Sequence, residues 1–198
     1  MIRLGEVLAG LHGAWLLARR RPEGLRYMDT SREGALRSFW AAVVALPATL
    51  PLVAMRLSHF PPRADALDVA LVEVVAYVVG WTAFPVLAHF AARIAEREDR
   101  YPALVVACNW TSLAQVVVLL VAAPVTLSDI LPPAIDALVE LGVRIALVAW
   151  LASAIRAALD VSWPAAIGLA VVEFVLGLSI FRTVVSLEDA WPLPPGAA

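Results

Sequence analysis

Five long apolar runs, separated by short polar segments, dominate the pattern of the chain. They lie at about residues 36–57, 67–94, 103–127, 134–158 and 164–184. A helix that crosses a membrane needs ~20 consecutive, mostly apolar residues, and each run reaches that length. The pattern therefore predicts an all-α fold, a polytopic transmembrane helix bundle of about five spans.

A shorter, amphipathic pattern precedes the first run. Apolar residues recur there at helical spacing, at Leu4, Val7, Leu8, Leu11 and Trp15. The spacing predicts an amphipathic helix in the membrane interface, with Trp15 as an anchor and with three arginines facing lipid headgroups, Arg19, Arg20 and Arg21. A helix packed on the protein's own cytoplasmic end fits the same pattern.

These patterns divide the chain into three parts. Residues 1–30 form the cytoplasmic amphipathic helix and an Arg-rich segment, 31–186 the membrane domain, and 187–198 a Pro-rich C-terminal tail. Thr30 and Glu33 have the spacing of a capping box, which predicts that a helix begins there.

The composition supports an integral membrane protein. Hydrophobic residues make up 62% of the chain and charged residues 16%, against about 45–50% and ~25% in average soluble domains. The net charge of −2 gives no indication of a nucleic-acid partner. The single cysteine, Cys108, excludes an internal disulfide, and no Cys/His spacing predicts a metal site or a cofactor.

The arginines predict the orientation. All fifteen Lys and Arg residues of the chain are arginine. Such a preference is associated with GC-rich bacterial genomes. Arginines concentrate before the first span and between the second and third, whereas residues 128–133 contain none. Because cytoplasmic loops carry the excess of positive charge, we expect a multi-pass protein of the bacterial cytoplasmic (inner) membrane, with its N-terminus inside and its C-terminus outside.

Six polar residues interrupt the predicted spans, namely Glu73, Asn109, Gln115, Glu140, Arg144 and Glu173. Two charges in the fourth span cost roughly 5 to 7 kcal/mol on the insertion scale, about what its apolar residues contribute. Glu140 and Arg144 are four residues apart and can pair. Most of these residues fall at similar depths, so we expect a buried polar core with three carboxylates around one guanidinium.

Two prolines interrupt the first span. Pro47 lies near its middle and Pro51 one turn later, and each removes a helix hydrogen bond. This predicts a broken helix that could line a path for protons or ions. A simple kink that shapes the bundle is the alternative.

The second and third spans carry a family resemblance. The second ends in Ala88-His89-Phe90, a polar loop follows at 93–101, and the third carries Asn109-Trp110. This stretch resembles the central part of the Yip family, small membrane proteins with five spans. The resemblance implies a relation to eukaryotic membrane-trafficking factors that bind small GTPases, and to bacterial members largely without an assigned activity. It implies no catalytic residues.

We therefore predict a structural, partner-binding or lipid-binding membrane protein. The polar core would fix the helices, and the N-terminal helix would meet anionic lipid or a membrane or cytoplasmic protein partner. The alternative is a small proton- or ion-conducting protein, a homo-oligomer that uses its intramembrane carboxylates. The histidines have no recognisable catalytic arrangement, so we expect neither an enzyme nor catalytic residues.

Overall fold

The computed structural model describes residues 3–126 and 132–190, and the regular structure there is helical throughout. Helix α1 (Leu4–Ala18) and the 3-10 helix η1 (Pro22–Tyr27) come first. The remaining elements follow in the order α2 (Arg32–Ser38), α3 (Trp40–His59), α4 (Ala66–Ile94), η2 (Glu98–Arg100), α5 (Tyr101–Thr126), α6 (Pro133–Leu159) and α7 (Trp163–Ala190). The all-α prediction is confirmed.

Five stretches of the described chain are long and apolar enough to cross a membrane. They are Arg32–His59, Ala66–Ile94, Glu98–Pro124, Pro133–Leu159 and Trp163–Ala190. This confirms the prediction of a polytopic bundle with five spans and a short N-terminal helix.

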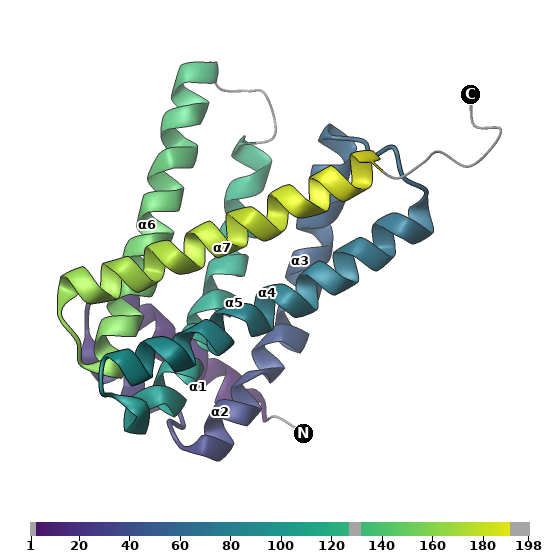
Figure 1. The fold of residues 1–198 in the computed structure, drawn as a ribbon. Helices are drawn as coiled ribbons and strands as arrows, with labels where there is room; N and C mark the ends of the chain where they lie inside the picture. The colour runs from purple at the N-terminus through teal and green to yellow at the C-terminus, as the bar shows by residue number, and fades with distance from the viewer. Residues whose placement is uncertain (1–2, 127–131, 191–198) are drawn as a thin grey trace.

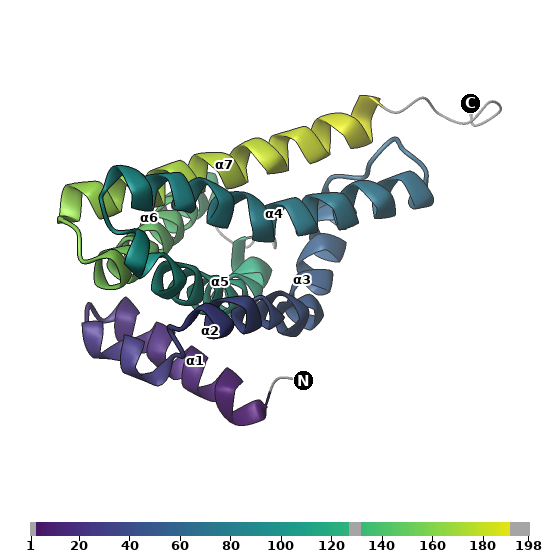
Figure 2. The ribbon, with the colours of Figure 1, turned by 60° about the horizontal axis from the view of Figure 1, so that its bottom comes forward.

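The helices form three layers (Figure 2). Helices α4 and α7 lie side by side on one face, and α1 lies on the opposite face, with α2, α3 and α5 between them. Helices α5 and α6 contact each other, and both also contact α1. The central position of α5 explains why its span is the most buried of the five.

The tightly packed core lies at one end of the bundle. Leu104 and Val106 at the start of α5 are fully buried, as are Ile155 and Leu159 at the end of α6. The first half of α6 is largely exposed. Helices α6 and α7 diverge from their shared end, as Figure 1 shows, so the bundle is compact at one end and wedge-shaped at the other.

The discontinuity in the first span is not where the prolines predict it. Helix α3 continues through both Pro47 and Pro51, and the boundary with α2 lies at Phe39, whose backbone keeps right-handed helical angles (φ −64°, ψ −16°). Helix α3 is therefore not broken at the prolines, and the alternative of a simple kink stays a prediction. Each proline takes one N–H out of the helix ladder, and the hydrogen bonds of the flanking residues keep α3 continuous.

The start of the first span and the end of the last also differ from expectation. Ser31, not Thr30, caps α2, because its Oγ accepts the N–H of Gly34 at 3.0 Å. Helix α7 extends to Ala190, so residues 187–190, assigned to the tail by sequence, are helical. The rest of the predicted tail, 191–198, lies outside the described residues.

Candidate functional site

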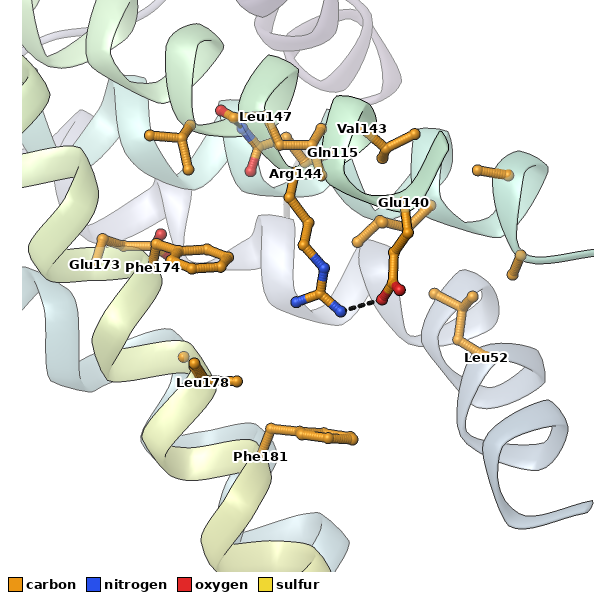
Figure 3. A pocket seen from close by; sticks show the side chains of 15 residues that line it. Leu52, Gln115, Glu140, Val143, Arg144, Leu147, Glu173, Phe174, Leu178 and Phe181 are labelled. Atoms are coloured by element: carbon orange, nitrogen blue, oxygen red, sulfur yellow. Dashed lines mark hydrogen bonds and ion pairs between the residues drawn. The ribbon is translucent and has the colours of Figure 1, made fainter. Parts of the chain in front are cut away.

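A cavity of about 430 Å³ lies in the wedge between α5, α6 and α7. We call it the wedge cavity. Figure 3 shows Arg144 and Glu140 extending from α6 and Glu173 and Phe174 from α7 into this space. Four of the six predicted polar residues line it, namely Gln115, Glu140, Arg144 and Glu173.

Glu140 and Arg144 form the expected ion pair within α6. Nη2 of Arg144 bonds Oε1 of Glu140, four residues earlier on the same face. The two side chains are 50% and 45% exposed within the protein alone. The pair therefore lies on the wall of the wedge cavity and not in a closed core.

Gln115 and Glu173 reach the wedge cavity from the neighbouring helices. Gln115 donates from Nε2 to the carbonyl oxygen of Leu147 at 2.9 Å, which ties α5 to α6. Among the described residues, no side chain or backbone group forms a hydrogen bond with the carboxylate of Glu173. The wall from α7 thus carries a carboxylate that the described part of the bundle does not pair.

Glu73 belongs to a second network, which corrects the prediction of one common core. Arg56 of α3 bonds both carboxylate oxygens of Glu188 on α7, at 2.8 and 3.0 Å, and Nη2 of Arg56 also bonds Glu73 on α4. Glu188 is only 2% exposed. One guanidinium therefore joins three spans where α3, α4 and α7 meet.

Little in the sequence indicates this network. Arg56 lies at the end of a predicted span and Glu188 in the predicted tail, so neither counts as an intramembrane residue on sequence grounds. The length of the fifth span is the sequence feature that could have identified Arg56 and Glu188. A fifth span as long as the second includes Glu188 and sets it opposite an arginine at the end of the first.

Asn109 lies in a third place, inside the compact end of the bundle. Its Nδ2 donates to Oγ of Ser38 at 2.8 Å, and both residues are buried. This bond joins α5 to α2 and satisfies polar groups that would be costly to leave unpaired in the core. Asn109 is thus separate from the wedge cavity.

The N-terminal segment packs on the same compact end through small residues. The face of α1 that contains Gly10, Ala14 and Leu17 is buried. Gly10 lies against the ring of Trp110, and Nε1 of Trp150 donates to the carbonyl oxygen of Ala14 at 2.8 Å. The alternative of a helix packed on the protein's own end therefore describes this face.

The opposite face of α1 remains apolar and exposed, at Leu4, Leu8 and Trp15. Arg19, Arg20 and Arg21 follow it and are exposed as well, with Arg20 above the ring of Trp163 at 5.5 Å. Helix α1 thus has two faces without charge, a packed inner one and an apolar outer one. The sequence pattern indicates only the outer face, because the inner one is made largely of glycine and alanine, which weigh little in a hydrophobicity pattern.

A cluster of charged side chains connects the N-terminal segment to the first span. Arg37 of α2 bonds Glu6 of α1 at 3.3 Å and also pairs with Asp29. Hydrogen bonds from the side chain and backbone of Ser31, with a contribution from Arg37, hold the pKa of Asp29 below its usual range. Asp29 therefore stays ionised and paired at neutral pH.

The described residues include no group of three or more His, Cys, Asp or Glu side chains that could hold a metal ion. Cys108 is buried in the compact end.

The arrangement of five spans agrees with a comparison to protein families. The family model described as Yip1 domain matches residues 16–182, from the end of α1 to near the end of α7. Comparison with curated proteins and with solved structures gives no match. Since the family model covers most of the sequence and reaches all five spans, the chain belongs to the Yip1 domain family.

Proposed function

We propose that this protein is a non-enzymatic membrane protein that binds a protein partner on the surface of its N-terminal layer, defined as residues 4–27. The polar contacts of the membrane domain serve to hold that layer and the spans in register. We further propose that the layer faces the cytoplasm of a bacterial cell and that the C-terminus faces outward, as the distribution of arginines indicates.

The observation that carries this proposal is the anchoring of the layer. Gly10 against Trp110, the bond from Trp150 to Ala14 and the ion pair of Arg37 with Glu6 attach α1 to three spans. A layer fixed at several points loses little conformational entropy when a partner binds. Its outward face combines apolar residues with arginines, a composition suited to binding.

The polar networks suit a structural role within this function. Arg56 joins α3, α4 and α7 through two carboxylates, and Asn109 joins α5 to α2. Polar contacts between transmembrane helices fix their relative positions, at roughly 0.6–2 kcal/mol each. They support a rigid scaffold for the N-terminal layer.

Site-specific photocrosslinking in native membranes tests the proposal. A photoreactive residue at Leu8, on the outer face of α1, should give a discrete protein adduct, and Arg19→Gln/Arg21→Gln should weaken it. Leu71 on α4 is the matched control, because it is similarly exposed, 56% against 58% for Leu8, but lies in a span. Lipid adducts alone at both positions would contradict a protein partner and would assign the layer to the membrane surface.

One observation favours ion conduction as a second candidate function. Glu140, Arg144 and Glu173 line a common cavity within the spans, and intramembrane charged residues commonly mark ion paths. Beyond that cavity the bundle is tightly packed around Ile155 and Leu159, so a path would need an oligomer. Proton flux into liposomes, abolished by Glu173→Gln, would support conduction, and flux equal to that of empty liposomes would exclude it.

A further inference from the structure

The wedge cavity contains both positively and negatively charged groups whose hydrogen-bonding capacity is not filled by the described part of the protein. Its volume of about 430 Å³ falls in the range of small-molecule sites, ~300–1,000 Å³. The cavity lies at the opposite end of the bundle from the N-terminal layer, so a ligand bound there is independent of the proposed function.

The cationic group is Arg144. A guanidinium has five N–H donors, and among the described residues only Glu140 accepts from it. The guanidinium extends into the space between α6 and α7 (Figure 3). Its free donors are suited to the oxygens of a phosphate, which arginine binds in a forked geometry.

The anionic group is Glu173, on the facing wall. Its carboxylate accepts no hydrogen bond from the described residues, whereas Glu140 is already paired with Arg144. The charged side chains of the cavity are two carboxylates and one guanidinium, so one carboxylate is left without a counter-ion. Phe174, beside Glu173, offers an aromatic face that also favours a cation.

The remaining walls are apolar. Leu52, Leu119, Val148 and Phe181 line the cavity from four different helices. These helices are long and apolar enough to be spans, so we expect the cavity to adjoin the acyl chains of the bilayer. Glu140 lies about 10 Å along α6 from Pro133, a depth that a lipid headgroup can reach from the adjacent surface.

We propose that the wedge cavity binds the zwitterionic headgroup of an aminophospholipid. The phosphate accepts from the free N–H groups of Arg144, the primary ammonium donates to Glu173, and the acyl chains follow the apolar surface between α6 and α7. A phosphate without an ammonium leaves Glu173 unpaired, and an ammonium without a phosphate leaves the Arg144 donors unpaired. Only the zwitterion matches both groups.

Native mass spectrometry of the purified, delipidated protein tests this with four probes. Phosphatidylethanolamine carries both groups, phosphatidylglycerol lacks the ammonium, phosphatidylcholine lacks ammonium N–H donors, and dodecylamine lacks the phosphate. We expect phosphatidylethanolamine to bind about tenfold more tightly than the other lipids, which corresponds to one charge-assisted hydrogen bond.

Glu173→Gln should reduce phosphatidylethanolamine binding about tenfold, to the level of phosphatidylglycerol. Glu73→Gln is the matched control, since it is the same substitution at an intramembrane carboxylate outside the wedge cavity.

A steric variant avoids any change of charge. Gly177 lines the cavity and a Cβ there meets no atom within 4 Å, so Gly177→Leu fills the space. Gly168→Leu on the same helix also has room but lies outside the cavity.

Equal binding of the three phospholipids would overturn the proposal, and so would phosphatidylethanolamine binding that survives both Glu173→Gln and Gly177→Leu. Preferential binding of dodecylamine would overturn it in favour of a site for simple amines. A dimer that binds no lipid and dissociates in Gly177→Leu would overturn it as well, because a second copy of the chain would then fill the wedge.

Discussion

At the scale of single residues, one guanidinium connects three spans of the membrane domain. Arg56 pairs with two carboxylates on different spans, and Glu188 is almost fully buried. The guanidinium contacts both carboxylate oxygens of Glu188 and also Glu73, so one positive charge is shared between two acids. Removing one partner from a buried pair costs more than the pair contributes, because the other charge remains buried and unpaired.

We expect Arg56→Gln to destabilise the protein by about 3 kcal/mol or more. The physical reason is that Glu188 would stay buried without a counter-ion. Thermal unfolding in mild detergent measures the loss, with Arg63→Gln in the exposed α3–α4 connection as the control. Equal melting temperatures for the two variants would show that the network does not contribute to stability.

At the scale of elements, α6 is divided into a packed half and a free half. Residues 151–155 are buried, whereas most of the helix before Leu147 is exposed or lines the wedge cavity. The free half contains Glu140 and Arg144, whose pairing within one turn reduces the cost of placing both in a membrane.

For this pair, Glu140→Gln alone should lower the yield of folded protein in mild detergent, because Arg144 cannot lose its proton. The exchange Glu140→Arg/Arg144→Glu should restore part of that yield by rebuilding the pair. Size-exclusion chromatography measures the monodisperse fraction of each variant. If Glu140→Gln behaves like the parent protein, the pair is not required for assembly.

Helix α1 depends on the close approach of a glycine to an aromatic ring. A Cβ at Gly10 would overlap the indole of Trp110, whereas a Cβ at Gly5 meets no atom within 4 Å. We expect Gly10→Ala to destabilise the docking of α1 by about 1–3 kcal/mol. Limited proteolysis between α1 and α2 reports on the docking.

Gly5→Ala is the matched control on the same helix. It should leave the proteolysis rate unchanged or lower it slightly, since alanine favours helix by up to ~1 kcal/mol. Faster cleavage in both variants would show that helix formation and not the contact with Trp110 decides the result.

At the scale of the whole molecule, the five spans form a bundle that is compact at one end and open at the other. The compact end carries α1 and its arginines, and the open end carries the wedge cavity. The two ends therefore offer different surfaces to the two sides of a membrane, and the orientation decides which side each one meets.

Cysteine labelling tests the orientation. In intact cells, an impermeant maleimide should label Arg63→Cys, between α3 and α4, but label Glu23→Cys only after permeabilisation. Both positions are exposed, and the native Cys108 is buried and should stay unlabelled. The reverse pattern would place the N-terminal layer outside.

The spans were predictable from the sequence because membrane insertion is encoded locally. Some twenty apolar residues in a row are enough to specify a spanning helix, whatever the neighbouring helices do. The pairing of Glu140 with Arg144 was predictable for the same reason, since both lie on one helix at a fixed spacing. The partners of Glu73 and Asn109 were not, because each is reached only through another helix.

The amino-acid order alone thus specifies the set of helices, their membrane character and the contacts within a single turn. Packing in three dimensions chooses which helix faces meet, and it divides the predicted polar core into the wedge cavity, the Arg56 network and the bond from Asn109 to Ser38. The physical reason is that depth along a helix follows from residue count, whereas the direction of a side chain around the bundle depends on how every other helix packs.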